Sequence, residues 1–115
     1  MIIQIMHIIA AIATILTGLY SLIKPTAITA FTGLQPVGGR GITEIRSILG
    51  GVFIALGAVP LALDAPAAYL MLGITYLAIA LVRGVSMVVD KSAVSSNIIS
   101  LIVEVVFGII LVIPA

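Results

Sequence analysis

The sequence predicts an all-α membrane protein, a bundle of four transmembrane helices that run up-down-up-down in a single domain over residues 1–115. Two observations predict this class. Hydrophobic residues make up 63% of the chain and charged residues only 8%, which is more apolar surface than a soluble core of this size can hide. The apolar residues also fall into four runs, 2–23, 42–63, 67–89 and 97–114, and a helix needs about 20 such residues to cross a bilayer.

Proline and polar residues separate these runs. Lys24-Pro25 ends the first run, because proline cannot continue a helix. Pro66 fits the first turn of the third helix, and residues 95–97 supply N-cap candidates for the fourth. The connection 25–41 is long enough to hold a short interfacial helix, and its glycine-rich end, 37–41, predicts a flexible turn.

The basic residues predict how the chain crosses the membrane. All of them flank the first or the third connection, whereas the second connection, residues 64–66, and both chain ends carry none. The positive-inside rule then places connections one and three in the cytoplasm and both termini outside the inner (cytoplasmic) membrane. The basic residues that decide this are Lys24, Arg40, Arg46, Arg83 and Lys91.

Several kinds of chemistry are not expected. The chain has no cysteine, and His7 is its only histidine, with no carboxylate at ligand spacing, so neither a metal site nor a cofactor is predicted. A net charge of +1 argues against a nucleic-acid partner. The connections carry no catalytic triad and no phosphate-binding loop. We therefore predict no catalytic residues and favour a protein that is not an enzyme.

The second run divides into distinct faces at about 100° per residue. Two of these faces carry small residues, and small residues let membrane helices approach closely. The pattern predicts that this helix is the central one, with bulky aliphatic residues turned to lipid. It also predicts a homo-oligomer or a membrane protein partner. The predicted packing residues are Ser47, Gly50, Gly51, Ala55 and Gly57.

Four charged residues lie inside the runs, namely Glu44, Arg46, Arg83 and Glu104. The three deepest lie roughly 8 Å inside a helix end at 1.5 Å per residue. A lone charge at the centre of a membrane helix costs about 2.5–3.5 kcal/mol on insertion scales. We therefore expect one charge layer in the cytoplasmic half, with Arg83 paired to Glu104 and Tyr76 as a polar neighbour. A structural ion-pair layer and a substrate or proton site both remain open.

The same residues carry a resemblance. Gly41-x-x-Glu44-Ile45-Arg46-Ser47-x-x-Gly50-Gly51, followed by Arg83-Gly-x-Ser86 and Glu104, resembles a family of small four-helix bacterial inner-membrane proteins. That family is catalogued only as a domain of unknown function and is distantly similar to DoxX-type proteins. The resemblance implies a four-span fold over nearly the whole chain. It implies no reaction.

The functional expectation follows from size and from the missing motifs. We expect an accessory or scaffold subunit of a membrane assembly, or a lipophile-binding module, embedded in the lipid bilayer. The alternative is a small transporter or proton path centred on Glu104, Arg83 and Tyr76. A third interpretation is an enzyme that acts on a lipid or quinone with Glu104 as acid or base.

Overall fold

The computed structural model describes residues 1–115, and every regular element in it is helical. Four rods in this structure are long and apolar enough to cross a membrane. This confirms the prediction of an all-α fold with four potential spans. The elements are α1 (Ile2–Ile23), α2 (Thr29–Thr32), α3 (Gly38–Glu44), the π-helix η1 (Ile45–Val52), α4 (Phe53–Leu63), α5 (Pro66–Val89) and α6 (Ser95–Val112).

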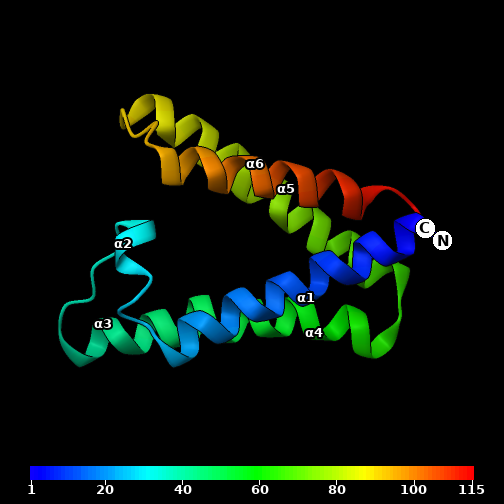
Figure 1. Cartoon of the computed structure of the whole chain (residues 1–115), viewed down its shortest axis with the longest axis horizontal. Coiled ribbons are helices and arrows are strands. Elements are labelled where there is room, and N and C mark those ends of the chain that lie inside the picture. Colours follow the sequence, from blue (N-terminus) through cyan, green and yellow to red (C-terminus); the bar gives the residue numbers. More distant parts are fainter.

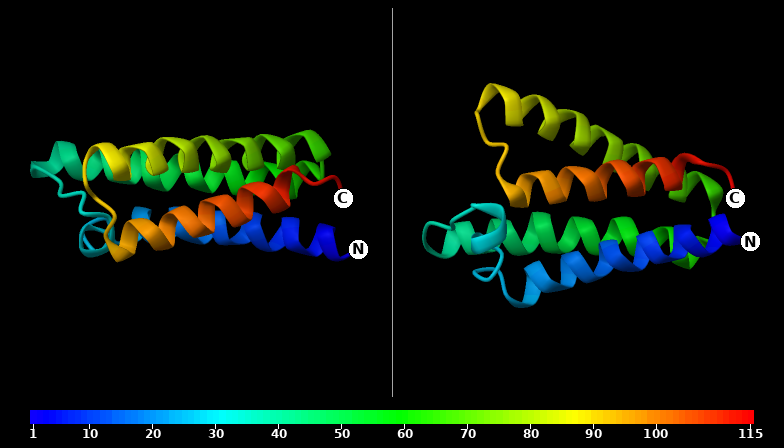
Figure 2. Two further views of the ribbon diagram at one scale, coloured as in Figure 1. Left: turned by 90° about the horizontal axis from the view of Figure 1, so that it is seen from above. Right: turned by 45° about the horizontal axis from the view of Figure 1, so that its top comes forward.

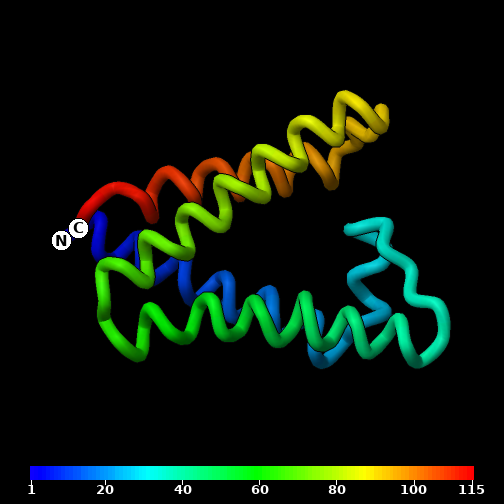
Figure 3. The backbone as a smooth tube through the Cα atoms, turned by 180° about the vertical axis from the view of Figure 1, so that it is seen from behind, coloured from blue at the N-terminus to red at the C-terminus, as the bar shows by residue number.

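The four rods form two antiparallel pairs that are arranged as a fork (Figure 1). In one pair, α1 lies along the continuous rod α3–η1–α4, and in the other α5 lies along α6. Figures 2 and 3 show that the pairs meet near the two chain termini and diverge toward the opposite end, where α2 lies. The molecule measures 44 × 30 × 17 Å. The bundle is therefore closed at one end and open at the other.

The central helix is α1, not the second span as the sequence analysis expected. It packs along α4 and η1 and also contacts α5 and α6. The reason is its composition, because small and short polar side chains leave room for neighbours on more than one side. The buried residues of α1 are His7, Ala10, Ala11, Thr14, Gly18 and Ser21.

The contact between α1 and the second span depends on glycines. A Cβ atom on Gly57 would lie 2.5 Å from the carbonyl oxygen of Ala11, and one on Gly18 would lie 2.7 Å from that of Gly50. Any larger residue at either position would push the two backbones apart. Gly50 and Gly57 are therefore packing residues in this structure.

The other three predicted packing residues do not pack. Ser47, Gly51 and Ala55 are exposed, and apart from the adjoining residues and the backbone of the same helix no atom lies within 4 Å of a Cβ placed on Gly51. The second span thus has one small-residue face against α1 and another on the outside of the fork. The sequence could not tell these two faces apart, because both have the composition of a packing face.

The π-helix explains why the faces of the second span differ from those of a regular helical wheel. The buried residues of the second span include Ile45 and Gly50 in η1 and Gly57 in α4. Ile45 and Gly50 are five residues apart, which is the spacing of hydrogen-bonded residues in a π-helix. Gly50 and Gly57 are seven residues apart, which is about two turns of a regular α-helix. A uniform 100° repeat predicts Arg46 on the face of Gly50 and Ile45 toward lipid. A π-turn holds one residue more than an α-turn, and this shifts the preceding residues around the helix axis. Ile45 is therefore buried and Arg46 is exposed.

Two helix starts also differ from the expected ones. The second span begins at Gly38 rather than Ile42, so most of the expected turn at 37–41 is helical. The fourth begins at Ser95, which places Asn97 inside α6 instead of at its N-cap. The first connection does hold a short helix, but α2 has only 4 residues and is followed by Gly33, whose φ of 74° is left-handed.

Candidate functional site

Two charged residues meet between α5 and α6, which run antiparallel and pack directly on each other. Glycines bring the helices together, since a Cβ on Gly108 would lie 2.5 Å from Leu77 Cδ2 and one on Gly73 2.8 Å from Leu111 Cβ. Arg83 lies beyond this close contact, near the C-terminal end of α5. Its partner in the facing part of α6 is Glu104.

The pair is bidentate. Arg83 Nε donates to Glu104 Oε1 at 2.8 Å and to Oε2 at 3.0 Å, and Arg83 Nη2 donates to Oε2 at 2.8 Å. Two parallel N–H···O bonds between a guanidinium and a carboxylate fix the orientation of both groups. The pairing that the sequence analysis expected for these two residues is therefore formed in the structure.

Asn97 completes the cluster. Its Oδ1 accepts from Arg83 Nη1 at 2.9 Å, and its Nδ2 donates to the carbonyl oxygen of Ser92 at 2.9 Å. The second bond ties the amide to the connection before α6, so it determines which end of the amide faces the guanidinium. The arginine is thus held by groups one heptad apart on the same helix.

The cluster leaves part of the guanidinium available. Of the five N–H groups of an arginine side chain, Nε–H, one on Nη1 and one on Nη2 are used by Glu104 and Asn97. One N–H on each Nη atom remains free of any bond to the chain. The Arg83 side chain is 31% exposed, whereas that of Glu104 is 10% exposed, so the arginine is the accessible member of the pair.

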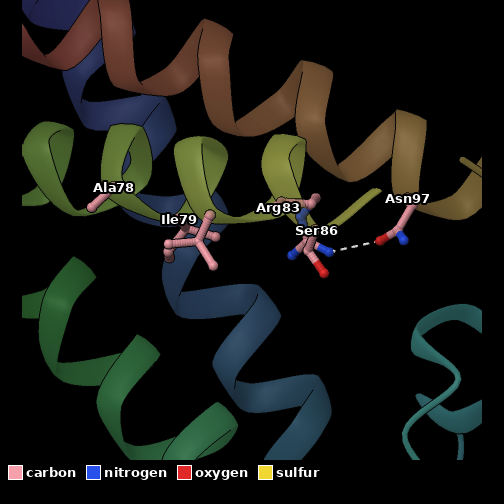
Figure 4. A pocket seen from close by; sticks show the side chains of 6 residues that line it. Ala78, Ile79, Arg83, Ser86 and Asn97 are labelled. Atoms are coloured by element: carbon pink, nitrogen blue, oxygen red, sulfur yellow. Dashed lines mark hydrogen bonds between the residues drawn. The ribbon is translucent and has the colours of Figure 1, made fainter. Parts of the chain in front are cut away.

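The exposed side of Arg83 faces a lateral groove of about 480 Å³ on the α5–α6 hairpin. Figure 4 shows Ala78, Ile79, Arg83 and Ser86 along one face of α5, with Asn97 reaching from α6. The Ser86 hydroxyl donates to Asp90. The groove is therefore apolar along one part, with hydrogen-bond donors at its polar end. Its lining residues are Ala78, Ile79, Val82, Arg83, Ser86 and Asn97.

Glu44 and Arg46 lie outside this cluster, so the structure has no layer of four charges. Glu44 forms an exposed i,i+4 pair with Arg40, which the early start of α3 places on the same helix face. Arg46 Nε donates to the carbonyl oxygen of Leu22 at 3.1 Å. That carbonyl belongs to the last turn of α1, where carbonyls lack helical partners and a cation is favourable. Arg46 therefore caps α1.

Tyr76 is not bonded to the ion pair either. Its hydroxyl bonds to Thr14 Oγ1, and Thr14 in turn donates to the carbonyl oxygen of Ala10. Because the threonine proton is used in the second bond, Tyr76 is the donor in the first. Its ring meets Phe107 edge-on, with 5.6 Å between centroids. Tyr76 thus joins α5 to α1 and α6 in the middle of the bundle.

Two functional candidates were missed or read differently in the sequence. Asn97 is one of the N-cap candidates at 95–97 and shares a helix face with Glu104, seven residues further on, but its bond to Arg83 is not predicted. For His7 the sequence predicts only the absence of a metal site. In the structure its side chain is 5% exposed, and its Nε2 lies 2.8 Å from the carbonyl oxygen of Ile110. A lone histidine carries no spacing signal that could have shown this.

Fold and site together define a small all-α membrane protein with a partly buried arginine–glutamate pair. The comparison with protein families gives the particular family: the profile described as "Domain of unknown function (DUF4345)" matches residues 2–114. The chain belongs to this family, which confirms the expected family of unknown function. Comparisons with curated proteins and with solved structures found no match.

Proposed function

We propose that this protein is a lipophile-binding module that holds the head group of an amphiphile against Arg83 in the lateral groove of the α5–α6 hairpin. The observation that carries the proposal is the guanidinium itself. Glu104 and Asn97 fix its position, and two of its N–H groups are left for an outside acceptor at the polar end of an apolar groove.

The depth of the site supports a membrane ligand. Arg83 lies six residues before the end of α5 at Val89, which is about 9 Å along the helix. Free N–H groups at such a depth find few acceptors among lipid tails, and an unmade hydrogen bond in an apolar medium costs about 1–3 kcal/mol. An amphiphile that reaches the groove from the bilayer supplies the acceptor and covers Ala78, Ile79 and Val82 with its chain.

The charges indicate which head group fits. Glu104 already neutralises Arg83 through both of its oxygens, so the site offers hydrogen-bond donors without a full net charge. Carbonyl and ester oxygens satisfy two N–H donors with no further charge buried. We therefore infer a carbonyl-bearing or ester-bearing amphiphile as the preferred ligand.

An experiment with matched variants tests this proposal. Val82 and Leu81 are adjacent on α5 and almost equally exposed, at 69% and 70%, but only Val82 lines the groove. Val82→Trp should therefore abolish binding of methyl palmitate to the protein in mild detergent, as measured by native mass spectrometry, while Leu81→Trp should not. Hexadecane has the same chain without the ester and should bind weakly. Equal binding of both probes, or equal loss in both variants, would contradict the proposal.

We also propose that the protein works within an assembly, through association with a second copy or a membrane protein partner. The observation in favour is the exposed face of Ser47, Gly51 and Ala55, where a neighbouring helix could approach closely. Gly51→Leu fills this face without touching the chain, so it should abolish the assembly seen by native mass spectrometry and leave the fold intact. A wild-type protein that is monomeric without a partner would contradict this proposal.

A transporter or proton path has less support. On α5 the polar residues Tyr69, Tyr76 and Arg83 follow one another at intervals of seven, or about 10 Å along the helix. Apolar core residues such as Leu72 lie between these layers. Proton flux into liposomes that depends on Glu104 would overturn this judgement.

The charge distribution also supports an orientation. Both termini lie at one end of the molecule (Figure 1), together with Asp64 of the second connection. The first and third connections, with Lys24 and Lys91, lie at the other end, as does Arg40 near the start of α3. We propose that this basic end faces the cytoplasm, that the membrane is the inner membrane, and that both termini are outside.

A further inference from the structure

At the end of the molecule away from Arg83, a second pocket of about 810 Å³ combines polar groups from three elements. His7 and Gln4 come from α1, Tyr69 from α5 and Asp64 from the connection between α4 and α5. Apolar side chains of α5 and α6, including Leu70 and Leu111, form much of the remaining wall. This pocket lies at the ends of the helices, where a bundle that spans a membrane would meet lipid head groups, and the groove at Arg83 has no residue in common with it.

His7 is held in one tautomer. The carbonyl of Ile110 would normally accept from the backbone N–H four residues later, but that residue is Pro114, which has no N–H. His7 takes this place, with Nε2 at 2.8 Å from the carbonyl oxygen. A carbonyl only accepts, so Nε2 carries the proton and Nδ1 of the neutral ring is left as a bare acceptor.

The Nδ1 atom of His7 has no hydrogen-bond partner in the chain. His7 is only 5% exposed, and its ring packs on that of Tyr69 with 5.2 Å between centroids. The chain gives Nδ1 no hydrogen bond, yet no fully enclosed side-chain nitrogen or oxygen lacks a partner. Nδ1 is therefore not fully enclosed, and His7 lines the pocket. An acceptor of this kind in a pocket wall favours a ligand that carries an N–H or O–H donor.

The charged side chain at the pocket end of the molecule favours a ligand with a positive charge. Asp64 is exposed and forms no ion pair in the structure. Every lysine and arginine side chain belongs to the opposite end or to the half of a span next to it. A cation with an N–H group matches the carboxylate, the Nδ1 acceptor and the aromatic rings together, because aromatic faces attract cations. We propose that this pocket binds the protonated primary amine of an amphiphile, such as the head group of an ethanolamine lipid.

The choice of a primary amine over a quaternary one rests on His7. A trimethylammonium group would satisfy Asp64 and the rings equally well, but it has no N–H to donate to Nδ1. Ethanolamine and choline lipids with identical chains therefore form a matched pair of probes. The apolar wall at Leu70 and Leu111 further predicts that octylamine binds more tightly than free ethanolamine, which distinguishes a membrane amphiphile from a soluble amine.

The test uses the single histidine of the chain as its reporter. In protein labelled with ¹⁵N-histidine in mild detergent, the ethanolamine lipid should shift the Nδ1 resonance of His7, and the choline lipid should leave it in place. Native mass spectrometry should show at least fivefold tighter binding of the ethanolamine lipid. Equal shifts and equal affinities for the two lipids would overturn the proposal. If free ethanolamine binds as tightly as octylamine, the ligand is a soluble amine and not a membrane amphiphile.

Three variants complete the test. Asp64→Asn should weaken binding about fivefold, and it should fold, because Asp64 has a left-handed φ of 48° that asparagine adopts readily. His7→Phe keeps an aromatic ring and removes the Nδ1 acceptor together with the bond to Ile110, so it should abolish the preference for ethanolamine over choline. Glu44→Gln removes the same charge from an exposed position at the opposite end and should change nothing. An effect of Glu44→Gln equal to that of Asp64→Asn would refute the site.

Discussion

The ion pair between Arg83 and Glu104 predicts a strongly non-additive pair of substitutions. Removing one partner of a buried pair costs about 3–5 kcal/mol, mostly because the other charge is left unpaired. The two residues should differ. The Arg83 side chain is long and 31% exposed, so after Glu104→Gln it can reach toward the interface, whereas the Glu104 side chain is short and 10% exposed. We expect losses of about 3 kcal/mol for Arg83→Gln and about 2 kcal/mol for Glu104→Gln.

The double variant decides whether pairing is the cause. It leaves no unpaired charge, so its loss should fall at least ~1 kcal/mol short of the sum of the two single losses. The free energy of unfolding can be followed by far-UV circular dichroism as a denaturing detergent is titrated into mild micelles. Arg46→Gln is the matched control, since Arg46 is exposed and makes one side-chain hydrogen bond, and it should cost less than ~1 kcal/mol. Losses that add within about 0.5 kcal/mol would refute direct pairing.

Three further predictions follow from the fold. Single cysteines at Ser92 and Ala65 should label from opposite sides of the membrane, and labelling from the same side would exclude four spans. Gly57→Leu should destabilise the protein by about 1–3 kcal/mol, because its Cβ meets the backbone of α1. Gly51→Leu should leave the free energy of unfolding unchanged. Equal losses for the two variants in the same titration would contradict the assignment of Gly57 to the face against α1 and of Gly51 to the exposed face. Tyr76→Phe keeps the ring contact with Phe107 and should cost about 1 kcal/mol for the lost hydrogen bond to Thr14; an unchanged unfolding free energy would show that this bond contributes nothing.

The sequence predicts the four helices well, because a span of the bilayer is a strong constraint on length and composition. It also predicts the pair of Arg83 and Glu104, since two charges at one depth on consecutive helices have few other partners. The arrangement of the helices as a fork could not be predicted from the sequence. Nothing in a run of small residues says whether the neighbour is α1 or a molecule outside the chain, so Gly51 and Gly57 look alike in the sequence.

The two missed polar contacts have a common cause. The bond of His7 to Ile110 depends on Pro114, a residue more than a hundred positions away whose effect is to remove a donor. The position of Asn97 depends on where α6 begins, and helix starts are uncertain by one or two residues from sequence. Long-range partners and exact helix ends are set by tertiary packing, which local patterns do not contain.

The π-helical stretch Ile45–Val52 has a consequence for comparing members of this family. It makes the second span one residue longer per π-turn than a regular α-helix that joins the same two ends. A relative without this stretch would keep the same inward face with one residue fewer. An alignment that allows no gap in this span would then pair Arg46, which caps α1, with a residue from the buried side of the rod. A single-residue gap between 45 and 52 would bring the equivalent positions of the two proteins back into register.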